Sequence, residues 1–353
     1  MRIGVVTTSY PRAPGDAAGS FVAAHVEAMR SLGHAVDVIG AHTIHSPLFE
    51  KSGAPDELER GGVRAILDGA WFTARLTAAV TRRARDWDLV VAHWLAPSAL
   101  AALPARKPLL AIAHGGDVHT LRRMHLLRPA LRLLRNARLV FVSSELRDLA
   151  GVSDALVQPM GVDVDHFMAL GRAPTTPPTI AVIGRLVPIK GVDVLLAALR
   201  DVRSDVRVVI AGDGPQRARL QRAAPPNVTF LGSVDAARRD QLLREASAVV
   251  IPSRVLPNGR SEGTPVVALE ALATGVPLIA SDVGGLRDLR GARRVSPENP
   301  GALAAAIDRV LVAPPSSAEL RASVAELAWS RVAKRLLQHA GCEAGDTNRR
   351  RSA

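Results

Sequence analysis

The segment "SEGTPVVALEALATGVPLIASD", residues 261–282, decides the fold because it joins a buried helix to a buried strand. From Pro265 to Ala273 every residue is apolar except Glu270. Thr264 and Pro265 predict the helix start, as the N-cap and the first helical residue, and the following glycine and proline predict its end. A helix that is apolar on every side is expected to lie between other layers of its domain.

Short apolar runs alternate with amphipathic segments along the whole chain. Strands are expected at 2–9, 35–41, 88–94, 108–116 and 137–144, and again at 179–186, 206–215, 227–234 and 247–253. Helices are expected at 20–33, with Ser20 as N-cap, and at 191–202. This alternation predicts an α/β fold with two doubly wound parallel sheets.

The segment "GRAPTTPP" (171–178) is rich in proline and threonine and reads as a linker. It predicts a first domain over 1–170 and a second over 171–324, facing each other across a cleft. An amphipathic helix within 325–344 is expected to pack back on the first domain. The polar end, 345–353, is expected to be disordered.

Composition limits the classes of protein that fit. The 353 residues are 48% apolar and 22% charged, which is typical of a soluble globular protein. The single cysteine, Cys342, cannot form an internal disulfide, the first residues form a strand rather than a leader, and no stretch is long enough to span a membrane. We therefore expect a cytoplasmic protein. The net charge of +12 favours anionic partners, but 3% aromatic residues argue against nucleic acid.

An unpaired carboxylate in the apolar helix would cost several kcal/mol. One interpretation of Glu270 is a structural ion pair with an arginine. The other is that Glu270 accepts hydrogen bonds from ribose hydroxyls, while the nearby helix N-terminus attracts an anion. The second interpretation describes a site for a nucleotide diphosphate.

The loop "GRLVPIKG" (184–191) supports that site because it follows the first strand of the second domain. Gly184 allows a close turn, and Arg185 and Lys190 are cations at the carboxyl edge of the sheet. Such cations neutralise a diphosphate and stabilise its charge as it leaves.

Together with "AGDGP" (211–215), "FLGSV" (230–234), "HGGDV" (114–118) and "PMGVDVDHF" (159–167), these segments resemble retaining GT-B glycosyltransferases of family 4, also called group 1. Glu262 and Glu270 match the Glu-x7-Glu pair of that family. The resemblance covers most of the chain and implies two Rossmann-like domains.

The resemblance also implies roles for matching residues. Donor binding falls to Gly184, Arg185, Lys190, Gly263, Thr264, Glu270 and, near the nucleobase, Val234. Catalytic positions are His114, Asp117 and Glu262. Gly19 and Ser20 match the loop that approaches the acceptor. Two short Asp-x-Asp matches, "DWD" (86–88) and "DVD" (163–165), are of a length expected by chance, so no metal site and no cofactor besides the donor is expected.

The implied reaction is retaining transfer of a sugar from a UDP- or GDP-sugar to a hydroxyl acceptor, such as a lipid-linked or polysaccharide intermediate. The resemblance implies that the acceptor attacks from the leaving-group side and that a phosphate oxygen takes its proton. The sequence offers no compelling enzymic nucleophile. Two alternatives are a sugar-nucleotide epimerase on the same architecture and a catalytically silent sugar-nucleotide-binding protein.

Two further features have two interpretations each. His93 either lines the acceptor cleft or packs in the core, whereas His25 reads as a structural or a surface residue. The segment 118–138 holds six arginines and no acidic residue. It is either a basic surface for peripheral contact with anionic lipid on the inner face of the membrane, or a solvated arginine face over a leucine core.

Overall fold

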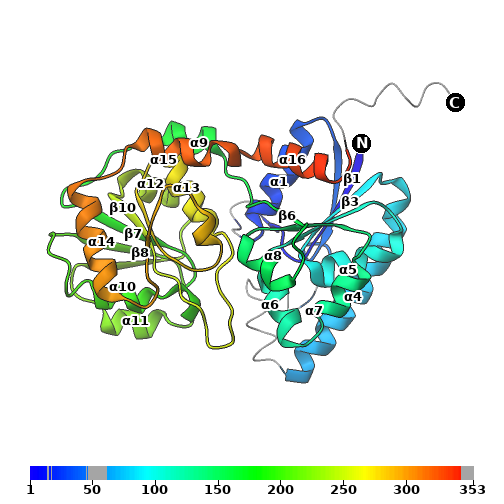
Figure 1. Cartoon of the computed structure of the whole chain (residues 1–353), viewed down its shortest axis with the longest axis horizontal. Coiled ribbons are helices and arrows are strands. Elements are labelled where there is room, and N and C mark those ends of the chain that lie inside the picture. The colour runs from blue at the N-terminus through cyan, green and yellow to red at the C-terminus, as the bar shows by residue number, and fades with distance from the viewer. Residues whose placement is uncertain (14–15, 17, 45, 47–61, 343–353) are drawn as a thin grey trace. The chain divides into compact units, whose positions relative to one another are not determined.

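The computed structural model describes residues 1–13, 16, 18–44, 46 and 62–342 and divides into two compact units (Figure 1). The first unit comprises 1–142, 146–158 and the chain from Trp329 onward, and the second comprises 143–145 and 159–328. Residues 159–170 thus lie in the second unit, although the sequence pattern grouped them with the first. The predicted tail, 345–353, lies outside the described residues.

The first unit is built on a parallel sheet of six strands in the order β2-β1-β3-β4-β5-β6. The strands are β1 (Arg2–Thr7), β2 (Ala35–Gly40), β3 (Leu89–His93), β4 (Leu109–Ala113), β5 (Arg138–Phe141) and β6 (Leu156–Val157). Strands β3 and β4 are buried at every position, as expected for a parallel sheet covered on both faces.

Helices cover the first sheet on both faces. They are α1 (Ser20–Ser31), α4 (Gly62–Arg83), α5 (Leu100–Ala102), α6 (Gly116–Arg123), α7 (Leu127–Leu133), α8 (Ser144–Ala150) and α16 (Trp329–His339). The last of these packs along α1, as Figure 1 shows. Among the residues that the structure describes, no helix is both long and apolar enough to cross a bilayer.

The second unit repeats the architecture with the strand order β12-β11-β10-β7-β8-β9. Its strands are β7 (Thr179–Ile183), β8 (Arg207–Ala211), β9 (Val228–Gly232), β10 (Ala248–Ile251), β11 (Leu278–Ser281) and β12 (Ala292–Val295). Its helices are α9 (Val164–Leu170), α10 (Val192–Ala198), α11 (Arg217–Ala223), α12 (Ala236–Glu245), α13 (Val266–Thr274), α14 (Pro300–Val312) and α15 (Ser317–Val324). The expected doubly wound α/β fold with two parallel sheets is confirmed.

The apolar helix of the opening segment is α13, and it packs against α9 and α15 on one face of the second sheet (Figure 1). Successive residues of β7 serve opposite faces: Ala181 joins the core around α13, while Ile180 and Val182 join the core on the other side. The small Ala181 leaves room for a closely packed helix on the α13 side.

The helix starts differ from the sequence expectation by one residue. Pro265 has an extended ψ of 128°, so it is the N-cap of α13 and the helix begins at Val266. Thr264 therefore precedes the cap. In α1 the cap is Gly19, with a φ of 68°, rather than Ser20. The predicted end of α13 is confirmed, because Gly275 has the left-handed φ of 83° that favours glycine.

Candidate functional site

Loops from several strands meet at the carboxyl edge of the second sheet. A short helical turn, Pro188–Lys190, follows β7 and presents Lys190, whose Nζ donates a hydrogen bond to Oε2 of Glu262. Both side chains are largely buried, with 23% of Lys190 and 13% of Glu262 exposed. Lys190, predicted to bind the donor, and Glu262, predicted as a catalytic position, are therefore direct partners, which the sequence did not predict.

A small pocket, partly open to solvent, lies beside Lys190 of this ion pair. It is lined by the ends of β7 and β10 and the loops after them: Val182, Ile183, Gly184, Arg185, Lys190, Val192, Val250, Ile251, Pro252 and Val267. Gly184 lies against Lys190, since a Cβ there would be 3.7 Å from Cε of the lysine. The structure thus brings the predicted diphosphate ligands Gly184, Arg185 and Lys190 to one cavity.

A glycine turn after β11 supports the loop that carries Glu262. Gly284 has a φ of 52°, and a Cβ at this position would lie 1.9 Å from the carbonyl oxygen of Glu262. The amide of Gly285 donates to that same oxygen at 3.1 Å, and a Cβ on Gly285 would lie 2.6 Å from Oγ1 of Thr264. Glu262, Gly263 and Thr264 therefore occupy a tightly supported turn immediately before α13.

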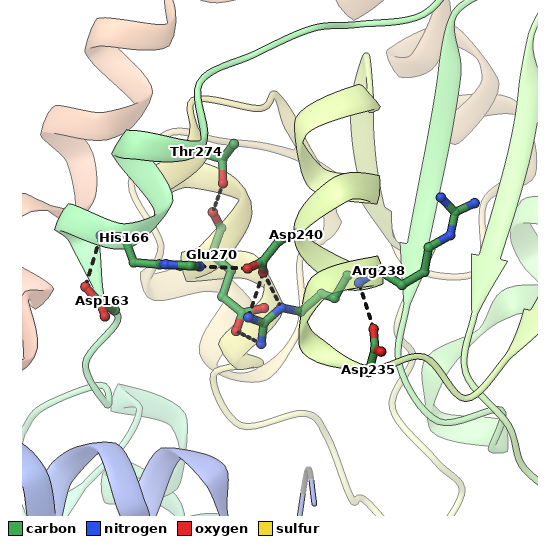
Figure 2. Close-up of polar contacts among 8 residues, drawn as sticks. Asp163, His166, Asp235, Arg238, Asp240, Glu270 and Thr274 are labelled. Carbon is green, nitrogen blue, oxygen red and sulfur yellow. Dashed lines mark hydrogen bonds and ion pairs between the residues drawn. The ribbon is translucent and has the colours of Figure 1, made fainter. Parts of the chain in front are cut away.

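Glu270 has the arginine partner that one interpretation predicted. It is 7% exposed, and its Oε1 accepts a hydrogen bond from Nη1 of Arg239 at 3.0 Å. No described residue donates a hydrogen bond to its second oxygen, Oε2. Figure 2 shows the helix around it, where the hydroxyl of Thr274 donates to the carbonyl oxygen of Glu270 at 2.9 Å. The ion pair thus explains how the carboxylate is tolerated and still leaves one of its oxygens without a protein donor.

Glu270, Asp240 and His166, which Figure 2 labels, belong with Arg239 to a wider polar network between α9, α12 and α13. Nη2 of Arg239 lies 2.7 Å from Oδ1 of Asp240, whose Oδ2 lies 2.7 Å from Nε2 of His166. The guanidinium also lies over the ring of Phe167, 5.2 Å from its centroid. Burial raises the pKa of Glu270 to about 6, with Arg239 opposing the shift and Asp240 adding to it.

Val234 follows β9, two residues before the start of α12. Its side chain is half-buried and packs against the apolar cluster around α13. It thus lies on the same side of the sheet as Glu270, and its predicted role at the nucleobase stays a prediction.

In the first unit, His114 directly follows β4, and Asp117 lies in the first turn of α6. The Asp117 carboxylate accepts backbone hydrogen bonds from Leu95 at 2.6 Å, Gly115 at 3.0 Å and His114 at 3.2 Å. Burial raises the pKa of Asp117, and these backbone donors oppose the shift. Asp117 therefore fixes the backbone around His114 rather than contacting the imidazole.

The imidazole of His114 is instead bonded to another histidine. Nδ1 of His93, the last residue of β3, lies 2.9 Å from Nε2 of His114, and Nε2 of His93 lies 3.1 Å from Nδ1 of His25 on α1. His93 and His25 are almost completely buried, at 0% and 1% exposure. The sequence analysis considered both residues, but no pattern in the sequence predicted that His93 contacts His114 or that His25 contacts His93.

The predicted acceptor loop lies where β1 leads to α1. Gly19 is buried with a φ of 68°, and a Cβ there would lie 2.3 Å from the carbonyl oxygen of Ser9. Only glycine fits this close approach. Ser20, the first residue of α1, is exposed.

The acidic tripeptides have structural partners. Asp88 accepts a hydrogen bond from the amide of Arg2 at 2.8 Å, and Asp163 caps α9 by accepting from the amide of His166 at 3.1 Å. Within the described part of the chain, no group of three histidine, cysteine or acidic side chains is arranged to hold a metal ion.

The fold and these loops match known proteins. Residues 18–166 match the model of Glycosyltransferase Family 4, and residues 177–312 match that of Glycosyl transferases group 1. The phosphatidyl-myo-inositol mannosyltransferase of Mycobacterium tuberculosis is 30% identical, over 96% of this chain and 96% of that protein. A Bacillus subtilis glycosyltransferase named for teichuronic acid biosynthesis is 29% identical, over 88% of this chain and 89% of that protein.

A solved structure supports the fold. HepE of Anabaena, in complex with UDP-glucose, superposes with a TM-score of 0.69 at 19% identity, covering 97% of this chain and all of that chain. The two parallel sheets, the matched family models and the full-length relative agree with one another. The chain is therefore a glycosyltransferase and belongs to family 4, group 1, of the GT-B fold.

Proposed function

We propose that the chain is a retaining, metal-independent glycosyltransferase that moves a sugar from a UDP- or GDP-sugar to a hydroxyl acceptor. The observation that carries the proposal is the Lys190–Glu262 pair beside the cavity that Arg185 also lines. Two cationic side chains at a sheet's carboxyl edge suit a diphosphate, and Glu262 holds one of them in place. The donor would bind to the second unit and the acceptor to the first.

The donor's ribose would bind at Glu270. Arg239 engages only Oε1, so the ion pair and a ribose contact are compatible. A ribose hydroxyl would donate its hydrogen to Oε2, and the carboxylate would keep its arginine partner. The amides at the first turn of α13, where no side chain caps the helix, would face the diphosphate.

Chemistry would begin as the bond between the anomeric carbon and the diphosphate oxygen breaks. Lys190, Arg185 and the α13 N-terminus would stabilise the negative charge on the leaving diphosphate. The acceptor oxygen would form its bond to the same face of the sugar, and its proton would pass to a phosphate oxygen. This sequence retains the anomeric configuration without an enzymic nucleophile.

The relatives guide the choice of acceptor. One is named for transfer of mannose to phosphatidyl-myo-inositol and the other for teichuronic acid, and HepE was solved with UDP-glucose. These names favour a lipid-linked or polysaccharide acceptor for this chain.

A donor screen followed by product analysis tests the proposal. We expect one UDP- or GDP-sugar to raise the melting temperature and, with a suitable hydroxyl acceptor, to yield a glycoside whose anomeric configuration by NMR equals the donor's. EDTA should leave the rate unchanged. An inverted product or EDTA-sensitive turnover contradicts the mechanism. Conversion of the donor's sugar without any acceptor would identify an epimerase.

The segment 118–138 supports a proposed peripheral membrane contact from the cytoplasmic side. Its buried leucines, Leu121, Leu127 and Leu134, belong to the core, so part of the pattern is structural. Three of its other apolar side chains are exposed: Met124 is 44% exposed, Leu126 45% and Leu133 61%. Its six arginines are also exposed: Arg122, Arg123, Arg128, Arg132, Arg135 and Arg138. Exposed apolar groups among arginines suit an anionic lipid surface.

Liposome flotation tests this contact. The chain should float with vesicles containing anionic lipid at low salt and remain in the dense fraction with neutral vesicles. Replacing Arg128 and Arg132 with glutamine should weaken flotation, because each basic group near the surface contributes about 1 kcal/mol. The matched control replaces Arg82 and Arg83 on α4. Flotation that is equal for both double variants, or absent at low salt, contradicts the assignment.

A further inference from the structure

Three imidazoles form one continuous hydrogen-bonded chain in the first unit. It runs from His25 on α1 through His93 at the end of β3 to His114 after β4, with N···N distances of 3.1 and 2.9 Å. The outer end, His114, is half-buried, and no described residue engages its Nδ1. The inner end, His25, stacks on Trp329 of α16 with the ring planes 17° apart.

Each ring of the chain is neutral. Burial lowers the pKa of His25 to about 4 and of His114 to about 3, and it lowers the pKa of His93 well below its usual value, where the two flanking histidines add to the shift. A neutral imidazole carries one N–H and one lone pair. His93 uses both ring nitrogens in the chain, so it must donate to one neighbour and accept from the other.

This count leaves two arrangements of the protons. Either all three rings carry their hydrogen on Nδ1, or all three carry it on Nε2. The tautomer of His114 is therefore tied to that of His25, even though the two rings do not touch.

The inner end favours the Nδ1 arrangement. Nε2 of His25 is buried and has no hydrogen-bond partner. An N–H at that atom would be an unsatisfied buried donor, which is rare in folded proteins. The Trp329 ring cannot accept a hydrogen bond from such an N–H, because the two rings are nearly parallel and an N–H in the imidazole plane would not point at the indole face.

We propose that His25 and His93 are positioning residues that hold His114 in the Nδ1–H tautomer, so that His114 donates a hydrogen bond to a substrate oxygen and does not act as a base. This inference rests on the proposed function only in placing His114 beside the reacting sugar. It adds a role for two residues that do not touch substrate, and it agrees with a phosphate oxygen as the proton acceptor.

The first test reads the tautomers directly. Protein labelled with ¹⁵N-histidine gives long-range ¹H–¹⁵N spectra that distinguish Nδ1–H from Nε2–H rings. We expect His25, His93 and His114 all in the neutral Nδ1–H form, assigned by single substitution of each. An Nε2–H form at His114, or different tautomers along the chain, overturns the proposal. This measurement needs no substrate, so its failure is distinct from failure of the proposed function.

The second test reverses the direction of the hydrogen bonds between the three histidines by substituting His25, the inner residue. Asn and Asp have the same shape and lose the same stacking on Trp329, but Asn can donate to Nε2 of His93 whereas an ionised Asp only accepts. H25D should therefore convert His114 to the Nε2–H form, while H25N keeps it as Nδ1–H.

Turnover should follow the tautomer of His114. We expect kcat of H25D to be at least about tenfold below that of H25N, with similar KM values for the donor, because a hydrogen bond to substrate is lost. Equal kcat values in the two variants, or an unchanged His114 tautomer in folded H25D, contradict the proposal. If H25D does not fold, the wild-type spectrum still decides it.

Discussion

Each unit has a parallel sheet with polar groups near its carboxyl edge, but the groups differ: histidines in the first unit, and cations paired with carboxylates in the second. At the carboxyl edge of the first sheet lie imidazoles joined by hydrogen bonds and a buried carboxylate held by backbone amides. At the carboxyl edge of the second sheet, Lys190 pairs with Glu262, and on the face of that sheet Arg239 pairs with Glu270. The comparison teaches that a parallel sheet's edge supplies a site, while its side chains decide whether the site suits neutral hydroxyls or a charged diphosphate.

Removing a cation from the second unit should have the largest effect. We expect Lys190→Ala to lower kcat by at least about 100-fold, since it removes a charge that we propose to stabilise the leaving diphosphate. Arg185→Ala should act in the same direction. Steady-state rates measure the loss of turnover, and melting temperatures show separately whether the fold of each variant is intact.

The matched control is Lys334→Ala, which removes an exposed lysine of α16. Its rate should equal that of the wild type. Wild-type rates in both Lys190→Ala and Arg185→Ala would show that the diphosphate lies elsewhere.

The neutral histidines should make the first unit sensitive to acid. An unfolded histidine has a pKa of 6.5, whereas burial lowers the pKa of folded His25 to about 4. Between these pH values the unfolded chain therefore binds a proton that the folded chain does not. Stability present above pH 6.5 is therefore lost as pH falls, by up to about 3 kcal/mol for this one ring. The free energy of unfolding of H25N, measured against the wild type by urea titration, should rise by about that amount between pH 6.5 and pH 4. A pH-independent difference would mean that His25 is protonated in the folded protein.

Glu270 should give the opposite pH dependence, with a smaller amplitude. Its pKa is raised from 4.5 to about 6, so the folded state holds this proton more tightly than the unfolded state, and stability falls as pH rises through that window. Glu270→Gln removes the titration. Its unfolding free energy relative to the wild type should increase by about 2 kcal/mol between pH 4.5 and pH 7.

Donor affinity separates the two roles of Glu270. If ribose binds to Oε2, the KM for the donor should rise in Glu270→Gln about tenfold, because a charged acceptor is lost. An unchanged KM would leave Glu270 with only its structural ion pair.

The sequence predicted the sheets because their strands are short apolar runs, such as "LVVAH" and "LLAIA", separated by helical segments. It also predicted that Glu270 needs a partner, since an apolar helix offers none. It could not choose Arg239 among the many arginines, because that choice depends on how α12 packs against α13. The histidine chain was missed for the same reason: His25 and His93 are 68 residues apart, and only the packing of α1 on the sheet joins them. The N-caps of α1 and α13 each differ by one residue from the prediction, because the cap position is set by local backbone angles that the residue types do not determine.

The path of the chain has a consequence for biosynthesis. The first unit is interrupted after Gln158 and is resumed only at Trp329, when α16 arrives to cover α1. A ribosome therefore completes the entire second unit before it supplies Val332, Leu336 and Leu337, the side chains that bury the apolar stripe of α1. Until then a nascent chain exposes that stripe, so the first unit is closed only after α16 has been made.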